Sequence, residues 1–184
     1  AATFNVTLDT TPPVGTVRVK GPRPYTNDVN VTLILDAQDA YGVVSVGVSS
    51  YPDFYQEQVL PYGTELPWRI QGGLGENTVY VRFYDAHGLV SAPACATVAF
   101  DPFPPSGPVV IDGGAQYTQG KVVRLDLDSS DEVGMLSVEL SNDPGMADPR
   151  AISVGTRTVE GWALAEGGDG PRTVYMRLTD LAGN

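Results

Sequence analysis

The sequence predicts an all-β protein built from two tandem β-sandwich domains. Its 184 residues include 21 Gly and 15 Pro, a composition typical of short strands joined by turns. Apolar and polar residues alternate over many short stretches, as they do on strands with one buried face. The first half of the chain also matches the second half after a shift of 92 residues, which indicates two copies of one fold.

The matched pairs run along most of the chain. They include Asp9 and Asp101, Tyr25 and Tyr117, Asp36 and Asp128, Asp39 and Asp131, and Ser49 and Ser141. The shift grows to 94 at the two tryptophans and to 95 at the Thr-Val-Tyr motifs of residues 78–80 and 173–175. Small insertions between these points are therefore expected in loops.

Period-two alternation predicts the strands in chain order. In the first copy they lie near residues 17–19, 31–35, 44–48, 68–70, 79–83 and 93–100, and in the second near 109–111, 123–127, 136–140, 162–164 and 174–178. In the third strand, Val44, Val46 and Val48 are expected to face the core. Residues 51–62 are expected to form a loop or a ragged edge strand.

The strand at residues 93–100 has no counterpart after the second copy. Its pattern occurs instead at the front of the chain, where Phe4, Val6 and Leu8 take the inward positions. We therefore predict a strand in residues 1–9 that completes a neighbouring sandwich. The first domain is predicted at residues 10–101, and the second, lacking its last strand (strand G), at residues 102–184.

About seven short strands per unit are typical of an immunoglobulin-like sandwich. The motifs Leu-Asp-Thr-Thr-Pro-Pro at residues 8–13, Thr-Val-Tyr-Val-Arg at 78–82 and Asp-Leu-Ala-Gly-Asn at 180–184 resemble bacterial immunoglobulin-like repeats. Those are tandem modules of large secreted and cell-surface proteins, so the resemblance implies an extracellular or cell-surface location. The first copy departs from the family ending, with Asp-Ala-His-Gly at residues 85–88.

Composition excludes several kinds of partner. A formal net charge of −11 with 11 Lys and Arg argues against nucleic acid, whose binding depends on basic residues. There is no long apolar run, so membrane insertion is not expected. A single Cys excludes an internal disulfide. The Ala-Ala start fits a mature secreted chain or an excerpt of a longer one.

The residue types do not suggest an enzyme. His87 falls in a predicted turn and is expected to be solvated, and a second His for a common catalytic zinc site is lacking. Cys95 is expected to face outward from its strand, as a covered or free thiol or in an intersubunit disulfide. Neither supplies a nucleophile paired with a base.

Acidic residues are expected to gather at one pole of each sandwich, where the leading segment meets two turns. They are Asp9, Asp36, Asp39 and Asp85 in the first copy and Asp101, Asp128, Asp131 and Asp180 in the second. Clustered carboxylates suit Ca²⁺, which takes six to eight oxygen ligands. The alternative is that each Asp caps a turn by accepting backbone N–H bonds.

Two further surface features remain open. Asn5 and Asn30 begin N-glycosylation sequons. Aromatic residues of the 51–62 stretch could form a glycan or protein contact or pack the loop onto its own sheet; they are Tyr51, Phe54, Tyr55 and Tyr62.

The leading hypothesis is a structural subunit of an extracellular filament or surface appendage. It would assemble head to tail, with its N-terminal strand donated to the open second domain of the next subunit. One alternative is an excerpt of a long tandem-repeat adhesin or stalk, in which the same strand completes a preceding repeat. A second is a carbohydrate-binding or adhesive module, including a virion decoration.

Overall fold

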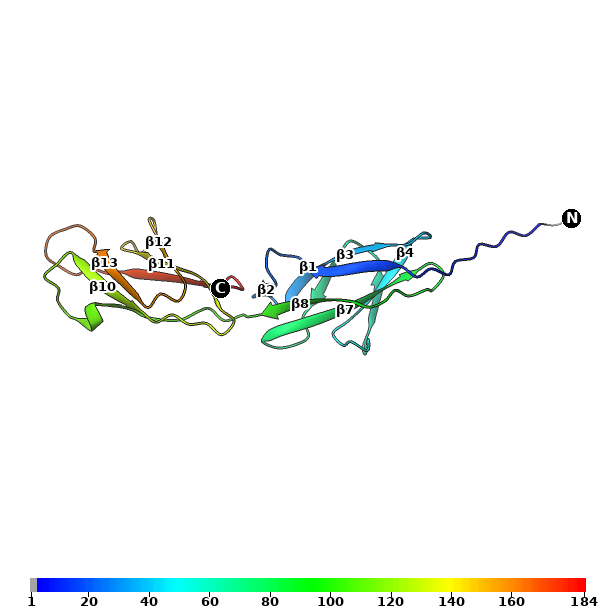
Figure 1. Cartoon of the computed structure of the whole chain (residues 1–184), viewed down its shortest axis with the longest axis horizontal. Coiled ribbons are helices and arrows are strands. Elements are labelled where there is room, and N and C mark those ends of the chain that lie inside the picture. The colour runs from blue at the N-terminus through cyan, green and yellow to red at the C-terminus, as the bar shows by residue number, and fades with distance from the viewer. Residues whose placement is uncertain (1–2) are drawn as a thin grey trace. The chain divides into compact units, whose positions relative to one another are not determined.

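The computed structural model describes residues 3–184 and confirms the all-β prediction (Figure 1). The chain divides into two compact units, Ala1–Asp101 and Pro102–Asn184. Each unit has two mainly antiparallel sheets that face each other across an apolar core, the arrangement of an immunoglobulin-like sandwich. No helix in the described part of the chain is long and apolar enough to cross a membrane.

In the first unit one sheet has three strands and the other has five. The three-stranded sheet has the order β1 (Val14–Val19), β3 (Asn30–Gln38), β6 (Glu65–Arg69). The five-stranded sheet has the order β2 (Tyr25–Thr26), β8 (Ala94–Phe100), β7 (Gly75–Asp85), β4 (Val43–Ser49), β5 (Gln58–Pro61). Leu33, Val46, Val81 and Phe83 are fully buried between the sheets, on the faces that the alternation predicts.

The second unit repeats this plan with three strands in each sheet. One sheet has the order β13 (Thr158–Ala163), β10 (Val122–Leu127), β9 (Val109–Ile111), and the other β12 (Arg150–Ile152), β11 (Met135–Ser141), β14 (Tyr175–Asp180). A 3-10 turn, η1 (Asp112–Gly114), follows β9. Leu125 and Leu140 are fully buried and lie in the core cluster with Trp162.

The structure corrects the prediction for the start of the third strand. Val44 is 50% exposed because the pairing of β4 with β7 shifts register between Val43 and Ser45. Such a β-bulge changes the phase of the alternation along the strand, so that Val43, and not Val44, packs against the core together with Val46 and Val48. The second unit has the same irregularity between Met135 and Ser137.

The two units differ at the edge of the sheet that contains β7 or β14. In the first unit β7 lies between β4 and β8 and runs for 11 residues. In the second unit β14 pairs only with β11 among the described strands and runs for 6 residues. The other edge of β14 therefore carries backbone groups without a ladder partner in the described chain.

Candidate functional site

The N-terminal segment carries an exposed apolar row. Residues 3–13 form no strand (Figure 1), and Phe4, Val6 and Leu8 are 93%, 94% and 81% exposed. Thr3, Asn5 and Thr7 alternate with them and are also exposed. Large apolar side chains that are exposed together at alternate positions are typical of a surface that a partner covers.

A groove of about 990 Å³ lies in the second unit. Two stretches of chain line it, one from Ile111 to Lys121 and one from Leu164 to Arg172. In the first unit, the counterparts of these stretches flank β8, because β2 pairs with β8 on one side and β7 pairs with it on the other. The groove thus lies where the second unit would hold a strand G.

Two buried carboxylates and the only histidine of the sequence meet at one pole of the first unit. One ligand atom from each of Asp9, Asp85 and His87 lies within 4.8 Å of the others. His87 Nδ1 is 3.0 Å from Asp9 Oδ2, and the Asp9 side chain is 3% exposed. His87 is exposed and lies in a turn, as expected, and it also contacts Asp9 and Tyr41, whose ring centroid lies 5.4 Å from that of His87 in a T-shaped arrangement.

The remaining predicted acidic residues do not join that group. Asp36 lies exposed within β3, opposite Thr16, because the strand continues to Gln38. Asp39 caps a turn by accepting the N–H of Tyr41. Asp128 is exposed and pairs with Arg157 at 3.5 Å.

The other three ligands predicted for the second copy are Asp101, Asp131 and Asp180. Asp101 is buried at the end of the first unit, where its N–H donates to Thr26 O. Asp131 and Asp180 have carboxylate oxygens within 4.8 Å of each other. Both cap turns, since Asp131 accepts N–H bonds from Val133 and Gly134. Asp180 similarly accepts bonds from residues 183 and 184.

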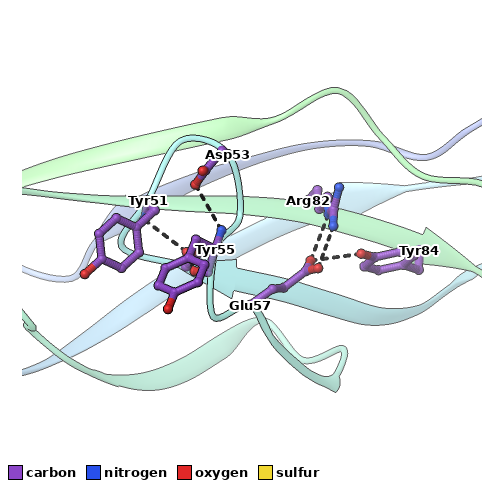
Figure 2. A network of polar contacts seen from close by, with 7 residues as sticks. Tyr51, Asp53, Tyr55, Glu57, Arg82 and Tyr84 are labelled. Carbon is purple, nitrogen blue, oxygen red and sulfur yellow. Dashed lines mark hydrogen bonds and ion pairs between the residues drawn. The ribbon is translucent and has the colours of Figure 1, made fainter.

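A polar network fixes the loop between β4 and β5 (Figure 2). Arg82 on β7 donates to both carboxylate oxygens of Glu57, at 2.8 and 2.5 Å, and the Tyr84 hydroxyl donates to Glu57 Oε1 at 2.9 Å. The Arg82 guanidinium also stacks over Phe54 at 4.3 Å. Phe54 has a φ of 59°, so the loop adopts a backbone conformation that needs such support.

The network also perturbs the ionisation of its members. The paired hydrogen bonds from Arg82 lower the pKa of Glu57, against the opposing effect of burial. Burial, reinforced by the hydrogen bond to Glu57, raises the pKa of Tyr84. The carboxylate and the phenol are thus held in opposite states, as one charged acceptor and one neutral donor.

Gly47 makes room for this network. Gly47 is the partner of Arg82 in the β4–β7 ladder, and a Cβ on Gly47 would lie 1.7 Å from Glu57 Oε1. In the second unit the matching pair is Glu139 and Arg177, whose side chains form an ion pair at 2.7 Å. The sequence does not reveal that Glu57 takes the role of Glu139, because the two glutamates occupy different places in the repeat.

The aromatic residues of the 51–62 stretch divide into two groups. Phe54 is buried, and Tyr62 accepts the N–H of Ala37 while its ring contacts Phe83. Tyr51 and Tyr55 are 46% and 60% exposed and meet edge to face at 5.4 Å. Of the four aromatic residues, these two are the exposed ones and could contact a ligand.

Tyr51 also lines a pocket of about 260 Å³ in the first unit. Gln71, Glu76 and Asn77 contribute polar groups to it, and Trp68 lies in its apolar part. The two sequon asparagines, Asn5 and Asn30, are exposed. Cys95 is also exposed, on the outer face of β8 as the alternation predicts.

Comparison with solved structures finds several similar chains. Fibronectin(III)-like modules of CbhA from Clostridium thermocellum match 91% of this chain and 87% of theirs, with a TM-score of 0.49 and 13% identity. Chitinase ChiA74 from Bacillus thuringiensis matches 96% of this chain and 28% of its own, with a TM-score of 0.40 and 12% identity. A tetra-tandem repeat from the extending region of a large adhesion protein matches 92% of this chain and 46% of its own, with a TM-score of 0.35 and 16% identity.

The chain therefore spans less than half the length of the last two structures. No protein-family model matches the sequence, and no curated protein matches it significantly. Similarity at this level assigns no activity, so the function has to be argued from the chain's own residues.

Proposed function

We propose that this chain is a non-enzymatic structural subunit of an extracellular filament or surface appendage. In this proposal residues 3–8 of one copy form strand G of the second unit of another copy. The observation that carries it is that the chain has both an exposed apolar row, Phe4, Val6 and Leu8, and a strand edge in the second unit without a partner in the described chain.

The length of β14 supports the acceptor role. The counterpart of β7 in the second copy spans residues 170–180, but β14 begins only at Tyr175. The residues missing from the strand, 170–174, correspond to residues 75–79, which pair with β8 in the first unit. Residues 170–174 thus lack strand pairing in the second unit, where the described chain has no strand beside them that corresponds to β8.

The first unit supplies a register for the donated strand. Val79 pairs with Ala96, and Asn77 pairs with Val98. By the internal repeat, Phe4 would lie opposite Val174 and Val6 opposite Arg172. Pro171 lacks an N–H, so the ladder would run from Arg172 to Tyr175.

Leu8 would lie beyond that ladder, at the other wall of the groove. In the first unit β2 pairs in parallel with β8, so that Thr26 lies beside Phe100. The corresponding neighbours would be Thr118 and Leu8. In this proposal the last apolar residue of the row would lie in the groove that is lined by the 111–121 and 164–172 stretches.

The gain from burial is large enough to matter for assembly. Covering Phe4, Val6 and Leu8 contributes about 1.5–3 kcal/mol each by transfer estimates. The new ladder also satisfies backbone groups along β14. Donation from one end of a chain to the other unit of the next is a head-to-tail contact, which extends into a fibre unless it closes.

Sedimentation of the purified chain over a range of concentrations tests the proposal, with one variant on each face of the strand. Val6→Asp places a charge on the inward face and should weaken association at least about 10-fold, the effect of about 1.4 kcal/mol. Thr7→Asp adds the same charge to the outward face and should leave association unchanged. A wild-type chain that stays monomeric, or equal effects of both variants, would contradict the proposal.

The tandem-repeat alternative uses the same strand within one polypeptide. It predicts that the native protein has a mass well above that of residues 1–184, because a preceding repeat would be joined covalently. Intact mass measurement of the protein from its native source distinguishes the two. A single long polypeptide would replace the filament with a stalk or adhesin.

A second candidate function is carbohydrate binding by the first unit. The observation that favours it is the exposed Tyr51 and Tyr55 pair beside the pocket with Gln71, Glu76 and Asn77. Glycan-array binding that is lost in Tyr51→Ala and Tyr55→Ala, but kept in Tyr41→Ala, would support this role. Binding unaffected by the two loop variants would exclude this surface as the site.

A further inference from the structure

We propose that Asp9, Asp85 and His87 bind one divalent transition-metal ion of the zinc type. The site joins the leading segment of the first unit to the turn that follows β7. Its ligand atoms already lie within 4.8 Å of one another, and all three residues belong to the same compact unit.

Asp85 provides the observation that points to a missing ligand. The residue is 3% exposed, and its Oδ1 accepts the N–H groups of His87 and Leu89. Its Oδ2 is buried and has no hydrogen-bond partner in the described chain. A buried carboxylate oxygen without a partner is costly, and coordination of a cation would satisfy it.

The turn holds the two side chains in fixed places. The Asp85 N–H donates to Leu89 O, and the Gly88 N–H donates to Asp85 O. Gly88 has a φ of 86°, which a glycine adopts without strain. Asp85 and His87 are thus presented from one closed turn, and the Thr11 N–H holds Asp9 Oδ1 at 3.2 Å.

The donor set selects the type of metal. Sequence reasoning expected Ca²⁺, but Ca²⁺ takes oxygen ligands, whereas imidazole nitrogen suits zinc and its neighbours. Zinc–nitrogen and zinc–oxygen bonds of about 2.0–2.2 Å at a tetrahedral angle separate the two ligand atoms by about 3.3 Å. The 3.0 Å between His87 Nδ1 and Asp9 Oδ2 needs only a small widening to admit such an ion.

Charge supports the same assignment. The carboxylates of Asp9 and Asp85 have oxygens within 4.8 Å of each other, and two negative charges this close repel. One divalent cation balances both carboxylates, and water completes the coordination. The ion would then fix Asp9, which lies next to the apolar row of the N-terminal segment, to the body of the first unit.

Titration of the tag-free, chelator-treated chain with ZnCl₂, CoCl₂ and CaCl₂ tests the site. We expect one equivalent of Zn²⁺ or Co²⁺ to bind, with the visible absorption bands of a low-coordinate Co²⁺ ion. Since the sequence has one His, imidazole ¹⁵N NMR reports on His87 alone, and its Nδ1 resonance should shift on addition of Zn²⁺.

Variants separate this site from general attraction of cations to an acidic protein. His87→Gln and Asp85→Asn should each weaken Zn²⁺ binding at least about 10-fold, the effect expected for loss of a metal ligand or its support. Asp39→Asn is the control. It removes one negative charge two residues from Tyr41, which contacts His87, and it keeps the side-chain oxygen that caps the turn. It should leave Zn²⁺ binding unchanged.

Three results would overturn the proposal. They are the absence of saturable Zn²⁺ binding by the wild-type chain, Zn²⁺ binding by His87→Gln equal to wild type, and saturable binding of Ca²⁺ without binding of Zn²⁺. The NMR measurement uses the wild-type chain, so it decides the role of His87 even if Asp85→Asn does not fold.

Discussion

Gly47→Ala tests whether the network around Arg82 stabilises the first unit. At a strand glycine with an ordinary φ, alanine is expected to stabilise by about 0.4–1 kcal/mol, because it restricts the unfolded chain. Gly47 is not among the glycines with positive φ. However, its new Cβ would lie 1.7 Å from Glu57 Oε1 and 2.7 Å from Glu57 Cδ, so the carboxylate would have to leave.

The expected cost follows from the bonds that are lost. Glu57 accepts two hydrogen bonds from Arg82 and one from Tyr84, and a bond to a charged group contributes about 1.5–3 kcal/mol. The Arg82 side chain is 32% exposed and the Glu57 side chain 14%. Hydration of the separated charges therefore offsets part of the free energy that is lost with these bonds. We expect a net destabilisation of about 1–2 kcal/mol, opposite in sign to the ordinary effect of the substitution.

Urea unfolding followed by tryptophan fluorescence measures this change. The sequence has two Trp, one in each unit, so a Trp162→Phe background leaves Trp68 as the reporter of the first unit. In a Glu57→Ala background the clash is absent, and Gly47→Ala should become neutral or stabilising. If Gly47→Ala stabilises the unit with Glu57 present, the argument from the network is wrong.

Three further predictions concern the pH dependence at Glu57, the buried hydroxyl of Ser49 and the core position of Val46. Because the pKa of Glu57 is lowered, the stability advantage of wild type over Glu57→Gln should be present above the ordinary glutamate pKa of about 4.3. This advantage should be lost as the pH falls through the lowered pKa of Glu57 in the folded state, which acid unfolding curves would show. Ser49→Ala should cost about 1–3 kcal/mol in urea unfolding, since the buried hydroxyl donates to Tyr55 O and accepts an N–H bond. Val46→Thr should lower the urea midpoint clearly and Val44→Thr should not, because Val46 is fully buried and Val44 is half exposed.

The strand faces could be predicted because they depend on a local signal. Alternation over five residues places Leu33 and Leu35 on one side of a strand, and both are buried. The bulge at Val44 breaks that rule because an inserted residue changes the phase without changing the composition. The two-residue strand β2 was also missed, since Tyr25 and Thr26 pair in parallel with distant β8 and have no alternation of their own.

The polar contacts were harder to predict than the strands. His87 and Asp9 are far apart in sequence, and only the closure of the sandwich brings Nδ1 and Oδ2 to 3.0 Å. The departure of residues 85–88 from the motif at 180–184 was a usable signal, because it placed an imidazole where the second copy has none. The pairing of Glu57 with Arg82 gave no such signal, since the glutamate comes from a loop whose path the repeat does not define.

The two units place a carboxylate against the same arginine position by different routes. In the second unit Glu139 is the cross-strand partner of Arg177, so the ion pair requires only the strand ladder. In the first unit Gly47 occupies the place of Glu139, and Glu57 reaches back from the loop to fill the space. The ion pair of the first unit therefore also fastens the loop to the sheet, together with the stacking of Arg82 on Phe54. The fastened loop carries the exposed Tyr51 and Tyr55, whose rings lie 5.4 Å apart. Because the first unit has Gly47 where the second has Glu139, its arginine pairs with a loop glutamate and supports the surface that these two tyrosines form.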